Sequence, residues 1–249
     1  MSQQQDIIFI HGVGLDHTMW SGVMAQMDKR FNCLAIDMPG HAGLPSPEQP
    51  GLSGYVDGLA SALGDVDGPV ALVGFSMGAL VAAQYTINHP DKVSRLVLMN
   101  AAHDRDADQR AAIRGRLETA EKEGPDALID RAIARWFTKD FVAGHPDVVA
   151  AIRHRLEIND PTAFLAAYRV FATSDGELAP DISRITCPTL ALTAANDANS
   201  TPVMSKAMAR VIPNATAHVL EGLAHGAPIE SPARVAAVLN PFLSNGDPS

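Results

Sequence analysis

Short apolar runs recur along this chain, and segments with helical spacing separate them. The runs occupy residues 7–10, 33–36, 70–73, 95–99, 189–193 and 216–220. Most of these runs are too short to form a helix, and most lack the period-two alternation of a half-exposed strand. Continuous apolar strands that alternate with helices indicate a parallel sheet that is buried on both faces. The pattern therefore predicts an α/β fold with a doubly wound, mostly parallel sheet of about six strands.

Residues 104–180 interrupt this alternation. The segment contains no strand-like run, and it shows helical patterns near 106–123, 125–137, 146–157 and 161–173. A helical insertion between two strands is most simply a cap over the mouth of the sheet. We therefore predict a core formed by residues 1–103 and 181–249, with a helical cap at 104–180. The alternative is a structural excursion that has no part in a functional site.

The charge of the chain narrows the range of partners. The chain has 19 Lys and Arg against 28 Asp and Glu, a formal net charge of −9, and no basic run. Such a chain is a poor candidate for binding nucleic acid or an anionic membrane surface. The excess negative charge lies outside residues 105–169, which hold 11 basic and 11 acidic residues. A small anionic substrate beneath the cap is therefore compatible with the acidic chain, because a few arginines can bind a carboxylate.

The first residues and the cysteine content favour a cytoplasmic protein. The start, MSQQQD, has no basic residues before an apolar stretch, which argues against a signal peptide. No apolar run approaches the ~20 residues that a membrane-spanning helix needs. The two cysteines, Cys33 and Cys187, are too few for a disulfide scaffold. We therefore expect a cytoplasmic protein with no membrane partner.

The segment Gly74-Phe75-Ser76-Met77-Gly78 directly follows one predicted strand and directly precedes a predicted helix. In that context the G-x-S-x-G pattern is typical of a nucleophile elbow, a sharp turn that exposes a reactive serine. The glycines leave room where side chains would collide, and the N-terminus of the helix favours negative charge near the serine. The alternative is a tight turn with an incidental serine. We predict that Ser76 is a catalytic nucleophile.

A serine hydroxyl needs a base to activate it, and the base needs a carboxylate to orient it. Asp197 and His225 each follow a predicted strand, so both would lie beyond the carboxyl ends of parallel strands, as Ser76 does. The chain order serine, acid, histidine is one of those known for catalytic triads. Asp104, in the loop after the strand 95–99, is the rival for the acid. We predict a triad of Ser76, Asp197 and His225.

The loop after the first strand reads His11-Gly12-Val13-Gly14. A tetrahedral intermediate needs two backbone N–H donors, one from the residue after the nucleophile and one from a loop of this kind. We therefore predict that the N–H groups of Val13 and Met77 form an oxyanion hole; the alternative is a plain β-turn. The loop lacks the third glycine of a dinucleotide-binding loop, and the chain has no H-E-x-x-H pattern, so we expect no cofactor and no metal.

Together these motifs resemble the α/β-hydrolase family over nearly the whole chain. In the order of that family, the chain reads HGVG at 11–14, DMPGH at 37–41, GFSMG at 74–78, HPDKVSRLVLMN at 89–100, CPTLALTAANDANSTP at 187–202 and GLAHGAPIESP at 222–232. The resemblance implies an α/β-hydrolase fold and a serine hydrolase that acts on ester bonds. The DMPGH turn is interpreted as structural rather than catalytic.

Within the family, the predicted cap is similar to that of 3-oxoadipate enol-lactone hydrolases and related small esterases. The similarity rests on Ala134-Arg135-Trp136-Phe137-Thr138, Phe141 and His145-Pro146. It implies a small ester or lactone substrate, because that subgroup cleaves a ring ester that bears a carboxylate, and it assigns Arg135, Trp136 and Phe137 to substrate binding. The alternatives are packing within the cap for Trp136 and Phe137, and a solvated helix face for Arg135.

Two of the departures from the family pattern bear on the sheet edge and on the pocket wall. The usual N-terminal hairpin has no counterpart, which would leave the strand 33–36 as an uncovered edge that a homodimer could protect. Gly226 follows His225 where many relatives have tryptophan or phenylalanine, and this predicts a more open wall of the pocket. Hydrolases of carbon–carbon bonds also use a serine but commonly have that aromatic residue, so they are the lesser alternative. A non-catalytic protein of the same fold that binds a small molecule is the other alternative, which the complete set of motifs disfavours.

Overall fold

The computed structural model describes residues 4–64, 66 and 68–244. Its strands form one sheet in the order β2-β1-β3-β4-β5-β6, and every neighbouring pair is parallel. The bounds are β1 Gln5–Ile10, β2 Phe31–Ile36, β3 Val70–Phe75, β4 Val93–Met99, β5 Thr189–Ala194 and β6 Ala215–Leu220. The predicted doubly wound sheet of six strands is therefore confirmed, and each strand contains its predicted apolar run.

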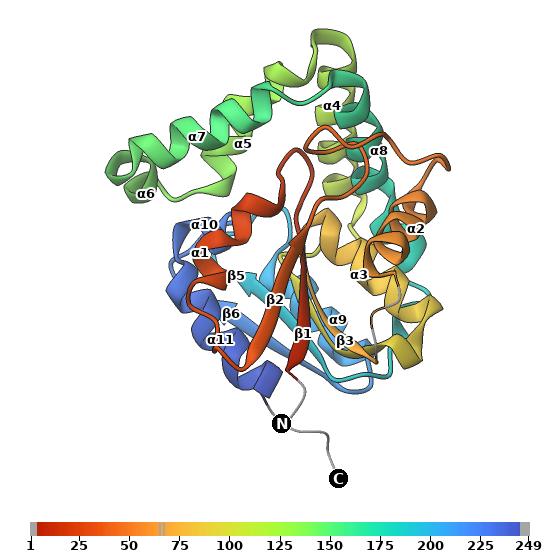
Figure 1. The fold of residues 1–249 in the computed structure, drawn as a ribbon. Coiled ribbons are helices and arrows are strands. Elements are labelled where there is room, and N and C mark those ends of the chain that lie inside the picture. The colour runs from red at the N-terminus through yellow and green to blue at the C-terminus, as the bar shows by residue number, and fades with distance from the viewer. Residues whose placement is uncertain (1–3, 65, 67, 245–249) are drawn as a thin grey trace.

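Helices cover both faces of the sheet (Figure 1). Successive side chains of a strand point to opposite faces. Accordingly, Ile8 and Leu72 belong to one apolar cluster, whereas Phe9 and Val73 belong to another. The helices on the first face are α2 (Leu52–Leu63), α3 (Met77–Asn88) and α9 (Pro202–Val211). The helices on the second face are α1 (Ser21–Met24), α10 (Ala227–Glu230) and α11 (Pro232–Ser244).

Strand β2 forms one edge of the sheet, because β1 is its only partner strand within the described residues. The side chain of Leu34 on this strand is 51% exposed. The edge predicted from the missing hairpin is therefore present, and β1 is the first strand of the described chain. An exposed strand edge can pair with a second chain, and a homodimer at this edge stays a prediction.

Five α-helices lie between β4 and β5 in the chain, and we call residues 107–178 the inserted helices. They are α4 (Ala107–Glu123), α5 (Ile129–Trp136), α6 (Lys139–Gly144), α7 (Pro146–Glu157) and α8 (Pro161–Leu178). Side-chain caps set where three of them begin, since Asp106, Thr138 and Asp160 each accept a backbone N–H from the first turn of the helix that follows. In Figure 1 the inserted helices lie above the carboxyl ends of the strands.

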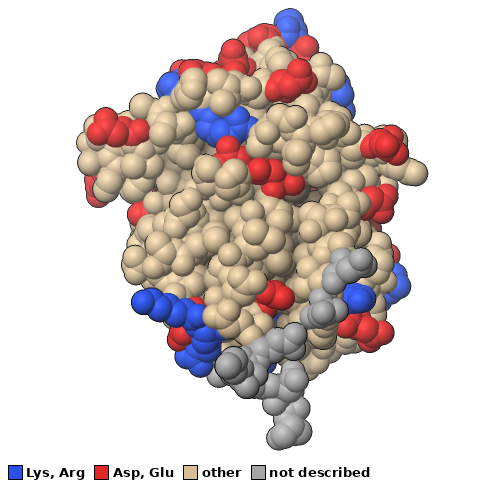
Figure 2. Space-filling model, viewed as in Figure 1, with Lys and Arg blue, Asp and Glu red and all other residues tan. Residues whose placement is uncertain are grey.

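Acidic and basic side chains are interspersed over the inserted helices on the face that Figure 2 shows. This distribution agrees with the equal counts of 11 basic and 11 acidic residues in 105–169. Across the described ranges, the structure contains no helix that is both long enough and apolar enough to cross a bilayer.

Candidate active site

The turn between β3 and α3 holds Ser76 at the carboxyl edge of the sheet. Ser76 has a φ of 54° and a ψ of −114°, a backbone conformation that residues with side chains rarely adopt. A Cβ on Gly74 would lie 2.4 Å from the carbonyl oxygen of Gly78, and a Cβ on Gly78 would lie 2.3 Å from that of His11, so both glycines are required. Ser76 is 5% exposed and lines a cavity beneath the inserted helices. The strained turn therefore presents the hydroxyl to that cavity, with the N-terminus of α3 behind it.

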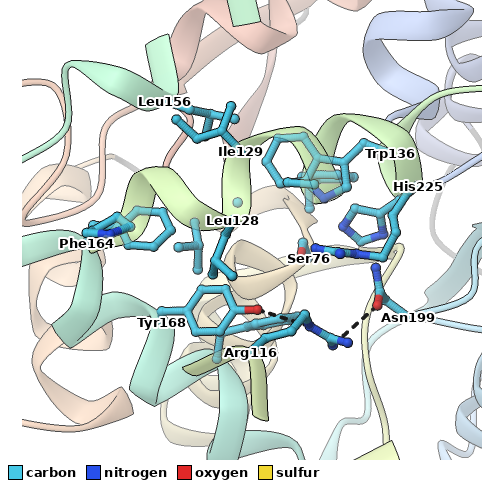
Figure 3. A pocket seen from close by; sticks show the side chains of 17 residues that line it. Ser76, Arg116, Leu128, Ile129, Trp136, Leu156, Phe164, Tyr168, Asn199 and His225 are labelled. Carbon is cyan, nitrogen blue, oxygen red and sulfur yellow. Dashed lines mark hydrogen bonds between the residues drawn. The ribbon is translucent and has the colours of Figure 1, made fainter. Parts of the chain in front are cut away.

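His225 and Asp197 form a buried, hydrogen-bonded pair near Ser76. The Nδ1–H of His225 donates to Oδ2 of Asp197 over 2.6 Å, and the two residues are 3% and 2% exposed. His225 and Ser76 line the same cavity, and Figure 3 shows the imidazole beside the serine. The ring of Phe75 packs against this imidazole, with 4.9 Å between the ring centroids. A hydroxyl, an imidazole and a carboxylate in this order can move a proton from the hydroxyl to the imidazole.

Four hydrogen bonds fix the carboxylate of Asp197. Besides His225, Nδ2 of Asn100 donates to Oδ2 over 2.7 Å, and the backbone N–H groups of Asn199 and Ser200 donate to Oδ1 over 2.8 and 3.0 Å. Burial raises the pKa of Asp197, but the charge of His225 and the hydrogen bonds to the carboxylate outweigh burial, so the pKa lies below its ordinary value. The carboxylate is therefore ionised and held in one orientation.

Asn100 is a site residue that the sequence analysis did not single out. It directly follows β4, is fully buried and has a φ of 49°, and its place immediately after a strand was the available signal. The rival acid, Asp104, lies on the same loop but is exposed, and its carboxylate pairs with Arg110 over 2.9 Å. Among the residues that the structure describes, Asp197 is the carboxylate that contacts His225.

The loop after β1 approaches Ser76 closely. A Cβ on Gly12 would lie 3.2 Å from the Cβ of Ser76 and 3.0 Å from the ring of Phe75, so this position favours glycine. Gly12 and Val13 line the cavity, and Met77 is the fully buried first residue of α3. Outside regular helices and strands, no backbone hydrogen bond within the described residues uses the N–H of Val13 or Met77. Both predicted oxyanion donors therefore lie near Ser76.

The inserted helices cover the cavity with apolar and aromatic side chains. These are Pro125, Leu128, Ile129, Ala132, Trp136, Leu156, Phe164, Tyr168 and Phe171. In Figure 3, Trp136 lies above His225, whereas Phe164 and Tyr168 lie at the opposite end of the cavity. The cavity has a volume of about 50 Å³, well below the roughly 300–1,000 Å³ of ordinary ligand pockets. Little free space therefore remains beside Ser76 in this conformation.

Two arginines bring positive charge to this apolar cavity. Arg116 on α4 donates from Nε to the hydroxyl of Tyr168 over 3.2 Å and from Nη2 to Oδ1 of Asn199 over 3.4 Å (Figure 3). Arg135 on α5 also lines the cavity, and its buried Nε has no hydrogen-bond partner within the described residues. Burial lowers the pKa of Arg135, and the positive charge of Arg116 lowers it further. In the described chain neither guanidinium forms an ion pair with Asp or Glu, so an anion in the cavity would be stabilised.

Of the three predicted substrate-binding residues, Arg135 and Trp136 line the cavity and Phe137 does not. The ring of Phe137 is buried, stacks on Phe141 with 5.1 Å between the centroids, and fills the space beside Gly226. A Cβ on Gly226 would lie 2.5 Å from Cε1 of Phe137. The more open wall predicted from Gly226 is therefore wrong, because an aromatic ring from the end of α5 occupies that space.

Comparison with known proteins gives concordant matches. The model of the Alpha/beta hydrolase family matches residues 7–238. A relative from Acinetobacter baylyi, named (E)-2-((N-methylformamido)methylene)succinate hydrolase, is 30% identical over 245 residues, which are 96% of this chain and 90% of the relative. The structure of a thermophilic esterase from Thermogutta terrifontis with malate bound has a TM-score of 0.84 at 27% identity, over 96% of this chain and 89% of that chain. The enol-lactonase from Burkholderia xenovorans has a TM-score of 0.85 at 25% identity, over 98% of this chain and 93% of that chain.

Proposed function

The chain belongs to the α/β hydrolase family, and from this premise we propose that it is a serine hydrolase that cleaves a small carboxylic ester or lactone. The observation that carries the proposal is the buried 2.6 Å hydrogen bond between His225 and Asp197 at the cavity that Ser76 lines. A hydroxyl, an imidazole and a carboxylate are the groups that acyl transfer through an acyl-enzyme requires. The similarity to an esterase and to an enol-lactonase supports an ester or a lactone as the bond that is cleaved.

Ser76 is the nucleophile of the proposed reaction. Its Oγ attacks the carbonyl carbon of the substrate while His225 takes the hydroxyl proton, and the carbonyl oxygen becomes an oxyanion. The intermediate collapses when His225 passes this proton to the leaving oxygen, and the acyl group stays on Ser76. A water molecule that gives a proton to His225 then attacks the acyl carbon, and Ser76 leaves with that proton.

Asp197 and two backbone N–H groups stabilise the charges that form during the proposed reaction. Asp197 keeps the proton of His225 on Nδ1 and stabilises the imidazolium that forms in each step. The N–H groups of Val13 and Met77 bind the oxyanion, and each such donor contributes on the order of 10²–10³-fold to kcat. Because the cavity is mostly apolar, these interactions act in a medium of low dielectric constant, where they are stronger than in water.

The substrate of the proposed reaction carries a carboxylate that Arg116 and Arg135 bind. Both guanidinium groups line the cavity, and within the described residues neither has an acidic partner. Two similar proteins are described with dicarboxylates, since one is named for a succinate and the other was solved with malate bound. The indole of Trp136, which also lines the cavity, would pack against the apolar part of such a substrate.

A panel of substrates with the two arginine variants tests this charge preference. The wild type is expected to hydrolyse carboxylate-bearing esters and lactones with a lower KM than uncharged nitrophenyl esters of the same length. Arg116→Ala and Arg135→Ala should each raise the KM for anionic substrates about 10- to 100-fold, because a hydrogen bond to a charged group contributes roughly 1.5–3 kcal/mol. The KM for uncharged esters should change little.

Arg114→Ala and Arg131→Ala are the matched controls. Both remove a positive charge from the same helices, α4 and α5, at exposed positions outside the cavity lining. These variants should keep the wild-type KM for anionic substrates. The proposed substrate charge would be contradicted if all four variants had equal effects on KM. It would also be contradicted if the wild type hydrolysed uncharged esters as well as anionic ones. Either result would leave the hydrolytic mechanism in place.

A further inference from the structure

The end of α7 and the turn that follows it contact the loop that carries Val13. Nδ2 of Asn159 donates to the carbonyl oxygen of Gly14 over 2.9 Å. Nε of Arg155 lies 2.8 Å from Oδ2 of Asp16, and the two side chains of this ion pair are only 14% and 13% exposed. The inserted helices therefore hold the loop 12–16 at two points, one on each side of Leu15.

Apolar side chains of the inserted helices press on the same loop. Gly14 has a φ of 75°, and a Cβ there would lie 2.9 Å from Leu156 on α7 and 2.9 Å from Phe164 on α8. Both of these side chains also line the cavity. The backbone on the C-terminal side of Val13 is thus confined between the site and the roof of the cavity.

The side chains of Asn159 and Arg155 also hydrogen-bond to each other. Nη2 of Arg155 donates to Oδ1 of Asn159 over 2.8 Å, while Nδ2 of Asn159 lies 3.1 Å from the carbonyl oxygen of Leu156 at the end of α7. On the other side of the contact, Asp16 caps the short 3-10 helix His17–Trp20 by accepting the N–H of Thr18 over 3.0 Å. The contact therefore joins the end of α7 to the start of that short helix through a small set of oriented polar groups.

We infer that Arg155 and Asn159 are positioning residues that set the N–H of Val13 for the oxyanion, so that the oxyanion hole is complete only when α7 and α8 are seated on the loop 12–16. This inference rests on the proposed function, because it assigns a role to the same oxyanion donor. The free volume of about 50 Å³ beside Ser76 is well below that of ordinary ligand pockets, so this inference has the inserted helices move when the substrate binds. Their return would then couple closure of the site to completion of the oxyanion hole.

Asn159→Ala, Asn159→Asp and Arg155→Ala test the inference. Asn159→Asp keeps the acceptor for Arg155 but cannot donate to Gly14, so it separates the contact with the loop from the contact within α7. Each variant is expected to lower kcat about 10- to 100-fold, below the effect of removing an oxyanion donor outright, with little change in KM. The affinity for a trifluoromethyl ketone, which forms an oxyanion with Ser76, should fall by a similar factor, whereas the affinity for the carboxylate product should not.

Arg153→Ala is the matched control, since Arg153 lies on the same helix and its ion pair with Asp130 is exposed and away from the loop 12–16. It should leave kcat and the affinity for the ketone unchanged, and thermal unfolding checks that all variants are folded. A folded Asn159→Ala or Asn159→Asp variant that keeps the wild-type kcat would overturn this inference but not the proposed function. A fall in kcat without a matching loss of affinity for the ketone would also overturn it, since that pattern indicates a structural role. If Ser76→Ala were as active as the wild type, the proposed function would fail first and the inference with it.

Discussion

Replacing Ser76 with alanine is expected to lower kcat for ester hydrolysis by about 10⁶-fold, the scale on which removal of a triad serine acts. The hydroxyl oxygen is the atom that the proposed mechanism joins to the acyl group, and a methyl group cannot form that bond. The residual rate would come from substrate binding and from the oxyanion donors, which the substitution leaves in place. Single-turnover and steady-state hydrolysis of a chromogenic ester measure the effect.

Ser205→Ala is the control for this substitution. Ser205 lies on α9, is fully buried and is outside the cavity lining. Its loss should leave kcat within about twofold of the wild type, because the substitution touches no group of the site. A folded Ser76→Ala variant that retains most of the wild-type kcat would show that Ser76 is not the nucleophile.

Asp197→Asn is expected to lower kcat by about 10⁴-fold, as the same change does in serine proteases. The pKa of Asp197 lies below its ordinary value, so the carboxylate that receives the Nδ1–H of His225 is ionised at neutral pH. An asparagine in its place could donate to Nδ1 and would then leave the proton on Nε2, where the imidazole could not accept the proton of Ser76. Substrate binding should change far less than kcat.

Asp104→Asn is the matched control, because it makes the same chemical change in the rival acid. The carboxylate of Asp104 is exposed and pairs with Arg110. Its neutralisation should therefore leave kcat near the wild-type value, since an exposed ion pair contributes little. The reverse pattern, with kcat lost in Asp104→Asn and kept in Asp197→Asn, would assign the orienting acid to the loop after β4.

The central strands β1, β3, β4 and β5 and the loops after them could be predicted from the sequence because these strands are mostly buried. A buried strand reads as an unbroken apolar run, and the end of that run marks the start of a loop. Ser76 and Asp197 follow such runs, and recognition of these strands placed both residues at one edge of the sheet. His225 follows β6, an edge strand whose residues are mostly exposed, and its place in the chain order after Asp197 was the further signal. Asn100 follows a strand too, but an amide carries no chemistry that would single it out.

The roof of the cavity could not be predicted in the same way. Helix α4 carries Arg110, Arg114 and Arg116, and helical spacing alone does not tell which of them faces the cavity. That choice depends on how α4 packs on its neighbours. The packing of the Phe137 ring against Gly226 likewise involves positions far apart in the chain, so a local sequence pattern cannot reveal it.

Helix α2 could not be predicted from a local pattern either. Its sequence contains Gly54 and Gly58, and glycine within a helix argues against one. In the structure a Cβ at Gly54 would lie 2.1 Å from the carbonyl oxygen of Gln49, and one at Gly58 would lie 2.4 Å from Pro39. The two glycines therefore allow close packing of α2 against neighbouring loops, and tertiary contacts outweigh the low helix propensity.

Reaction with an alkyl fluorophosphonate tests the central claim most directly. An activated serine attacks the phosphorus, fluoride leaves, and a stable phosphonate ester remains on the serine. We predict stoichiometric labelling of the wild type and of Ser205→Ala, with the adduct on the peptide that contains Ser76, and no labelling of Ser76→Ala. A folded wild type that is not labelled, or a Ser76→Ala variant that is labelled equally well, would contradict the claim that Ser76 is an activated nucleophile.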